Sequence, residues 1–187
     1  GKLTGLNASG PAPRGLSLEN LVKAGLDGVP SSGIHTVTVP GAVRGFAEIH
    51  RRFGKLPWKD LFQPAIFFAE NGFPVTELIQ WDWDASRSKL LADPNATAVF
   101  LKDGQAPRVG DLFRNPQLAA AYRALAAEGP DSFYRGTLAK AILSTSKRLG
   151  GFLTAGDLAA FEVEWVQPVS IDYRGWKVSQ LPPNGQG

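Results

Sequence analysis

The sequence predicts an α+β fold in which helices predominate. Apolar residues recur every three or four positions through most of residues 42–149, a spacing typical of helices with one buried face. Over residues 161–181 the period changes to two, as in strands. Because 43% of the 187 residues are hydrophobic, the chain can bury a core without disulfides or a structural metal.

The N-terminal part combines an irregular segment with two short elements. Residues 1–16 are rich in Gly and Pro and predict little regular structure beyond a short strand at the start. A short helix is expected within residues 17–33, with Ser17 as its N-cap. Residues 36–39 alternate polar and apolar side chains, which predicts a strand that ends at a Pro-Gly corner, residues 40–41.

Two helices are expected after this corner. The first ends at Gly54 and has an apolar face that consists of Val43, Phe46, Ala47 and Phe53. The second begins near Pro57 and ends at Asn71-Gly72. Pro64 lies inside it, and a proline in a helix interior costs about 3 kcal/mol because it removes a hydrogen bond and clashes one turn back. We therefore expect the helix to restart at Pro64.

The middle of the chain is predicted to alternate between helices and one strand. Residues 76–92 are expected to be helical, and residues 97–101 are expected to form a strand. A helix over residues 116–128 has clear boundaries, with Asn115 as N-cap and a proline at the first helical position. Another helix is expected over residues 137–149.

The C-terminal part begins with a short helix. Thr154 and Asp157 have the spacing of a capping box, and the helix that they start is expected to end near Phe161. The following alternation of apolar and polar residues predicts a small antiparallel meander, with strands at residues 161–165, 169–173 and 176–181.

Composition argues against several classes of function. The 20 Lys and Arg are spread along the chain rather than gathered in a basic stripe, so no nucleic-acid partner is expected. No apolar run approaches the roughly 20 residues that cross a bilayer, so no membrane span is expected. His35 and His50 are the only histidines and cysteine is absent, so we expect no metal site. No cofactor is expected, because the chain has neither a phosphate-binding loop nor a dinucleotide fingerprint. The compartment stays open between the cytoplasm and a periplasmic or secreted location.

The chain shows no catalytic constellation of its own. Ser31 and Ser32 are not surrounded by the Gly-x-Ser-x-Gly pattern of a nucleophile elbow, and no base can be assigned to them. Asp82 and Asp84 are two positions apart, which places them on opposing faces of a helix. A paired-carboxylate site is therefore not expected.

Several ordered motifs resemble the large subunit of the gamma-glutamyltranspeptidases. They are Pro40-Gly41, Phe53-Gly54, Leu56-Pro57-Trp58, Pro64-Ala65-Ile66, Gly72-Phe73-Pro74-Val75, and residues 129–136, 150–161, 173–175 and 182–187. The resemblance implies the helix-rich part of the αββα sandwich of N-terminal-nucleophile hydrolases, with the short antiparallel meander at its C-terminal end. Residues 1–187 would then be a single partial domain, the large-subunit segment of a precursor.

The resemblance also implies an activity. Members of this family hydrolyse or transfer gamma-glutamyl groups, for example from glutathione, after the precursor cuts itself to expose an N-terminal threonine as nucleophile. The nucleophile and the oxyanion donors belong to the small subunit, so no catalytic residue is assigned within residues 1–187. The small subunit of the same precursor and a small-molecule gamma-glutamyl substrate are the expected partners.

Substrate binding is the one role that the resemblance places in this segment. In the family, an arginine three residues before the Ala of an Ala-Pro pair anchors the α-carboxylate of the gamma-glutamyl group. Matching that pair to Ala12-Pro13 puts Ser9 at the arginine position, and a hydroxyl cannot supply the paired charge-assisted hydrogen bonds of a guanidinium. The candidate substrate-binding residues are therefore Arg14, from two positions beyond Ala12, and Ser9 itself. The alternatives are a surface charge for Arg14 and a turn role for Ser9.

Two departures from the family pattern keep other functions open. One is Ser9, and the other is the Asn-Gly-Gln sequence at residues 184–186, where the family usually has a serine-containing loop. Both indicate a branch of the family. One alternative is an acylase of the same fold that acts on glutaryl or related side-chain amides, and another is a non-catalytic helical interaction module.

Overall fold

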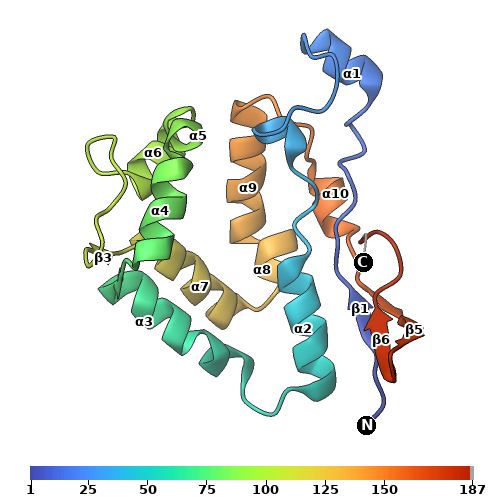
Figure 1. Cartoon of the computed structure of the whole chain (residues 1–187). Coiled ribbons are helices and arrows are strands. Elements are labelled where there is room, and N and C mark those ends of the chain that lie inside the picture. Colours follow the sequence, from blue (N-terminus) through green and yellow to red (C-terminus); the bar gives the residue numbers. More distant parts are fainter. Residues whose placement is uncertain (186–187) are drawn as a thin grey trace. The chain divides into compact units, whose positions relative to one another are not determined.

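The structure is a computed structural model that describes residues 1–185. Contacts divide the chain into two compact units. Unit 1 combines Gly1–Pro57 with the C-terminal part from Glu128, and unit 2 is the continuous segment Trp58–Ala127. Helices predominate in both, and within residues 1–185 the strands form three two-stranded antiparallel sheets (Figure 1). The helix-rich α+β prediction is confirmed.

Unit 1 contains both the first and the last elements of the chain. Its elements are β1 (Gly5–Asn7), α1 (Leu18–Lys23), the 3₁₀ turn η1 (Ile34–Thr36), α2 (Ala42–Phe53), α8 (Asp131–Tyr134), α9 (Thr137–Arg148), α10 (Ala155–Ala159), β4 (Glu164–Val166), β5 (Val169–Tyr173) and β6 (Trp176–Gln180). Strand β1 pairs with β4, and β5 pairs with β6 as a hairpin. The C-terminal antiparallel strands are thus confirmed, but the first of them pairs with β1 instead of β5.

The strand predicted over residues 36–39 is wrong. Residues 34–36 form the 3₁₀ turn, and Val39 donates its amide to the Pro11 carbonyl at 2.9 Å without entering a ladder. The facing segment contains Pro11 and Pro13, which have no N–H groups to donate to a ladder. Residues 37–39 therefore form no ladder: the Val37 amide donates to the Ile34 carbonyl at 3.3 Å, and the bond from Val39 to Pro11 is the contact with the facing segment. Val39 is only 1% exposed.

The core of unit 1 lies among α8, α9, α10 and the segment before α2. Its buried members are Val39, Tyr134, Ala139, Leu153, Leu158 and Phe161. Two side chains on the inner faces of the helices, Ile142 and Val43, pack against this cluster. The predicted capping box is confirmed, since Thr154 and Asp157 bond each other's backbone amides at the start of α10.

Helix α2 is also tied to β4 by a charged cluster. The Glu48 carboxylate accepts hydrogen bonds from Nε and Nη2 of Arg51, at 2.8 and 2.7 Å, and from Trp165 Nε1 at 2.8 Å. The Arg52 guanidinium lies 4.2 Å from the centre of the Trp165 ring. The bonds from Arg51 and Trp165 lower the pKa of Glu48 to about 2, so this carboxylate is charged at neutral pH.

Unit 2 is a continuous run of short helices. Its elements are the 3₁₀ turn η2 (Trp58–Phe62), α3 (Gln63–Asn71), β2 (Phe73–Pro74), α4 (Glu77–Ala85), α5 (Arg87–Leu91), α6 (Pro94–Phe100), β3 (Leu112–Phe113) and most of α7 (Pro116–Glu128). The predicted restart at Pro64 is confirmed, because η2 ends at Phe62 and α3 has the proline in its first turn. The predicted N-caps Ser17, in unit 1, and Asn115 are confirmed as well.

Two predictions in unit 2 need correction. The strand expected over residues 97–101 is wrong, because residues 94–100 form α6. The β-branched Thr97 and Val99 favoured a strand, but Asp93 accepts the Ala96 amide at 2.8 Å and Pro94 begins the helix. The single helix expected over residues 76–92 is divided into α4 and α5 at Ser86.

Candidate functional site

Both candidate substrate-binding residues lie on one loop of unit 1, residues 7–14, which starts at the last residue of β1. At its start Asn7 Oδ1 accepts the Ser9 amide at 3.0 Å, a local turn of the kind that asparagine favours. Asn7 Nδ2 donates to Asn184 Oδ1 at 3.2 Å, so the loop starts beside the Pro-Pro-Asn-Gly segment near the C-terminus. Residues 186–187 of that motif lie outside the described residues. The side chain of Ser9 is exposed at the turn.

The backbone of the 7–14 loop lies directly against the Pro-Gly corner. A Cβ on Gly10 would overlap the carbonyl oxygen of Val39, and a Cβ on Gly41 would overlap the carbonyl oxygen of Ala8. The Val39 amide adds its hydrogen bond to Pro11. Glycine is therefore required on both sides of this contact, because any side chain would push the two backbones apart.

The Pro-Gly corner is fixed in turn by Tyr134 of α8. Its hydroxyl donates to the Pro40 carbonyl at 2.8 Å and accepts the Arg44 amide at 2.9 Å. Helix α2 has Gly41 as N-cap and no side-chain cap from its own sequence, so the Tyr134 hydroxyl satisfies one of its free first-turn amides. Burial raises the pKa of Tyr134, which keeps this hydroxyl protonated at neutral pH.

The far end of the loop is held by Asp157, the capping-box residue of α10. Its Oδ2 accepts the Thr154 amide at 2.9 Å and the Thr154 hydroxyl at 2.6 Å, and its Oδ1 accepts the Arg14 amide at 3.2 Å. Asp157 is only 6% exposed. Burial raises the pKa of this carboxyl, but the hydrogen bonds from Thr154 and from the Arg14 amide outweigh it, so the pKa lies below its usual value. Asp157 is therefore ionised at neutral pH.

The side chain of Arg14 extends into solvent from this anchored backbone. It is 80% exposed, and its Nε lies 4.0 Å from Asp157 Oδ1. Among residues 1–185 no other partner of the guanidinium is recorded, so the two Nη groups are open to a ligand. Such a fork can bind a carboxylate with two parallel hydrogen bonds. The structure places Ser9 and Arg14 on the same loop and records no contact between them.

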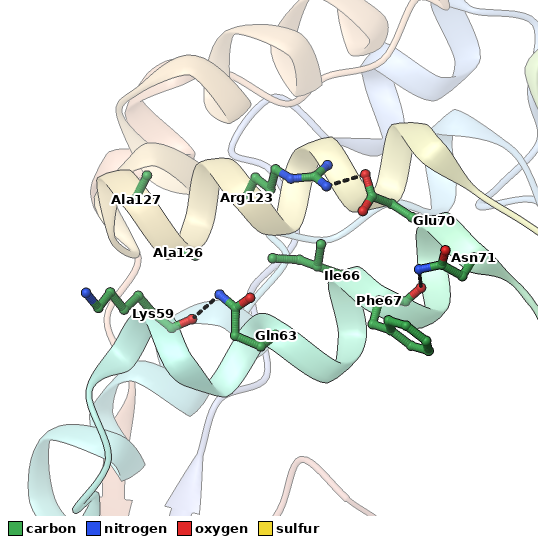
Figure 2. A pocket seen from close by; sticks show the side chains of 9 residues that line it. All are labelled: Lys59, Gln63, Ile66, Phe67, Glu70, Asn71, Arg123, Ala126 and Ala127. Atoms are coloured by element: carbon green, nitrogen blue, oxygen red, sulfur yellow. Dashed lines mark hydrogen bonds and ion pairs between the residues drawn. The ribbon is translucent and has the colours of Figure 1, made fainter.

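A hollow lies in unit 2 between α3 and α7 (Figure 2). It has a volume of about 550 Å³, and Ile66 and Ala126 form part of its apolar wall. Its opposite charges, Arg123 and Glu70, form an ion pair with each other, and Figure 2 shows Lys59 at one end of the hollow. The ion pair satisfies both of these groups, and no ion pair of Lys59 is recorded within the described residues.

In the part of the chain that the structure describes, neither a metal-binding group nor a membrane-spanning helix is found. Residues 1–185 contain no group of three His, Cys, Asp or Glu side chains that could hold a metal ion. Within the same residues, no helix combines the length and apolar character needed to cross a membrane.

Sequence reasoning missed two residues that shape the loop. The Thr154-Asp157 spacing predicted a capping box, but nothing local indicated that Asp157 also binds the Arg14 amide, 143 positions away. Tyr134 lies inside a quoted family motif, but only the structure shows that its hydroxyl bridges Pro40 and Arg44.

Comparisons with known proteins agree with this description. The family model described as gamma-glutamyltranspeptidase matches residues 1–187. A glutathione hydrolase-like proenzyme of Bacillus subtilis is 35% identical over 182 residues, which cover 97% of this chain and 34% of that protein. The chain therefore spans about a third of this curated relative.

Solved structures give the same result for the fold. The cephalosporin acylase of Bacillus halodurans superposes with a TM-score of 0.92 at 41% identity, over 99% of this chain and 36% of the acylase chain. The gamma-glutamyltranspeptidase of Helicobacter pylori superposes with a TM-score of 0.89 at 30% identity, over 98% of this chain and 54% of that chain. The fold is that of the corresponding part of these N-terminal-nucleophile hydrolases. This chain therefore belongs to the gamma-glutamyltranspeptidase family.

Proposed function

We propose that the chain is the large-subunit part of an enzyme that hydrolyses or transfers gamma-glutamyl groups, such as that of glutathione. The observation that carries the proposal is the open guanidinium of Arg14, on a loop whose backbone is held by Asp157 and by the Pro-Gly corner. Family membership supports the activity, and a relative named a proenzyme supports the expectation of a second subunit from the same precursor. We further propose that residues 1–187 are a single partial domain of the large subunit.

In this proposal the chemical step belongs to the small subunit. The hydroxyl oxygen of its N-terminal threonine attacks the gamma-glutamyl carbonyl carbon, and the α-amino group of the same threonine takes up the hydroxyl proton. The amide C–N bond then breaks, and the leaving amine departs with that proton. Water or an acceptor amine resolves the resulting acyl ester. The present chain binds the substrate and orients its carbonyl toward the threonine.

Arg14 is the residue proposed to hold the α-carboxylate of the substrate. A guanidinium forms two parallel charge-assisted hydrogen bonds to a carboxylate, each stronger than a bond between neutral groups. Ser9 is proposed as a weaker contact, because its exposed hydroxyl can donate one hydrogen bond. The Asn7 turn fixes the backbone from which this hydroxyl extends.

An acylase for glutaryl or related side-chain amides is the second candidate. The specific observations are Ser9 at the place where the family has an arginine, and the likeness to a cephalosporin acylase. A glutaryl group has the same carboxylate spacing as a gamma-glutamyl group but no α-amino group. Arg14 would therefore serve both substrates, and recognition of the amino group separates them.

The first test uses the full protein that contains this chain. After expression and incubation, mass spectrometry is expected to find two pieces, the smaller beginning with threonine. Rates on gamma-glutamyl and glutaryl p-nitroanilides then distinguish the two candidate substrates. A protein that stays intact and cleaves neither anilide would refute both enzyme candidates and favour a non-catalytic interaction module.

The second test concerns Arg14. Arg14→Ala is expected to raise the KM for the gamma-glutamyl anilide on the order of tenfold to a hundredfold, since hydrogen bonds to charged groups contribute about 1.5–3 kcal/mol. Arg148→Ala, which removes an exposed arginine of α9, is the matched control and is expected to leave KM unchanged. An unchanged KM in Arg14→Ala would remove this residue from the substrate site.

A further inference from the structure

Asp157 uses its two carboxylate oxygens for two different purposes. A capping box needs the side chain to accept the N-cap amide, and Oδ2 does this for Thr154. The other oxygen, Oδ1, accepts the amide of Arg14 from the 7–14 loop. The helix start is therefore complete without Oδ1, and the bond to Arg14 is an additional role of the same buried carboxylate.

This additional bond holds the backbone of Arg14 itself, from which the side chain extends into solvent. Pro13 is buried and its carbonyl accepts the Leu16 amide at 2.9 Å, so the chain on both sides of Arg14 is fixed. The side chain itself is 80% exposed, and Asp157 is its one recorded partner within residues 1–185. Asp157 Oδ1 lies 4.0 Å from Nε, and no contact of the Nη groups is recorded within residues 1–185.

We propose that Asp157 is a positioning residue for substrate recognition, whose carboxylate aims the Nη groups of Arg14 at the substrate α-carboxylate. The inference rests on the proposed function of Arg14. Preorganisation explains the effect, because an arginine whose backbone amide is already bonded and whose Nε lies near a carboxylate loses less conformational entropy when it binds. Asp157 touches no substrate and acts through Arg14 alone.

The test measures selectivity for the substrate α-carboxylate in the full protein. Each variant is assayed with two substrates, gamma-glutamyl p-nitroanilide and 4-aminobutanoyl p-nitroanilide. The second acyl group is the first without its α-carboxylate. The ratio of kcat/KM for the two substrates reports carboxylate recognition, and a general loss of stability or of active enzyme cancels from it. Asp157→Asn is expected to lower this ratio by about threefold to tenfold, which is less than the effect of Arg14→Ala.

Two further variants separate positioning from helix capping. Thr154→Ala removes the capping hydroxyl but leaves the bonds from the Thr154 and Arg14 amides to Asp157, so its ratio is expected to equal that of the unmodified protein. Asp157→Glu keeps the charge and a capping-box side chain but displaces the oxygen from Arg14, so it is expected to lower the ratio even if Asp157→Asn does not fold.

The decisive comparison is the double variant. In an Arg14→Ala background, Asp157→Asn is expected to cause no further change in the ratio, because the residue acts only through Arg14. The inference would be overturned, with the role of Arg14 intact, if Asp157→Asn lowered the ratio equally with and without Arg14, or if neither Asp157 variant changed the ratio. The same would follow if Thr154→Ala lowered the ratio as much as Asp157→Asn. A ratio that is unchanged in Arg14→Ala would overturn the inference together with the proposed substrate contact.

Discussion

The buried hydroxyl of Tyr134 is expected to stabilise unit 1 through its two hydrogen bonds. It satisfies the Pro40 carbonyl and the Arg44 amide, and Tyr134 is only 1% exposed. Tyr134→Phe keeps the ring and removes both bonds. At about 1 kcal/mol for each intramolecular hydrogen bond, the free energy of unfolding should fall by about 2 kcal/mol. In a domain of 150–250 residues this corresponds to a fall in Tm on the order of 4–8 °C, and the fall is smaller in a larger protein.

The measurement is urea unfolding of the full protein, followed by tryptophan fluorescence, together with a thermal scan. Tyr173→Phe is the matched control, since Tyr173 lies on the exposed hairpin and its substitution should change stability by less than about 0.5 kcal/mol. A Tyr134→Phe variant as stable as this control would refute the assignment of the hydroxyl as the cap of α2.

The same hydroxyl predicts a pH dependence. Burial raises its pKa above the usual value of 10, so the neutral form is favoured in the folded state. Its contribution to stability is therefore fully present below pH 10 and is lost as the pH rises through the folded-state pKa. Tyr134→Phe should lack this alkaline loss, and an alkaline limb of equal size in the variant would assign the titration to another group.

Two more predictions concern the acid limb and the glycine contact. The pKa of Glu48 is lowered to about 2 from the usual 4.5, so its contribution to stability is present above pH 4.5 and is lost as the pH falls toward 2. Glu48→Gln should remove this acid loss, as followed by tryptophan fluorescence. An unchanged acid transition would contradict the role of the Arg51 pair. Gly41→Ala should destabilise the fold by about 1–3 kcal/mol in urea unfolding, because its Cβ would overlap the Ala8 carbonyl. Gly28→Ala, with nothing within 4 Å of the added carbon, is the control and should be nearly neutral.

Sequence signals predicted the helices whose ends are set by neighbouring residues in the chain. Asn115 followed by a proline marks the start of α7, Pro64 marks the restart at α3, and the Thr154-Asp157 spacing marks α10. The prediction failed at residues 97–101, where β-branched residues 97 and 99 indicate a strand but the Asp93 side chain caps a helix. A cap that satisfies free amides outweighs the weak strand preference of two residues.

The tertiary contacts of the candidate site could not be predicted in the same way. Matching the family motif located Ser9 and Arg14, but the residues that hold their loop come from distant segments. The pairing of Gly5 with Val166 and the bond from the Arg14 amide to Asp157 join positions far apart in the sequence. No periodicity or turn signal specifies which distant group will meet a given backbone amide.

These distant contacts have a consequence for the order in which the protein folds. Unit 2 is one continuous segment and can form its contacts as soon as residues 58–127 have been synthesised. Unit 1 cannot complete its contacts until residues that follow unit 2 in the sequence reach the 7–14 loop. Asp157, for example, binds the Arg14 amide across 143 positions. Lengthening the closed loop adds only about 0.6 kcal/mol for each doubling, so the separation affects the folding rate more than the final stability. On the ribosome, the 7–14 loop therefore stays without its anchor until Asp157 has emerged, well after unit 2 is complete.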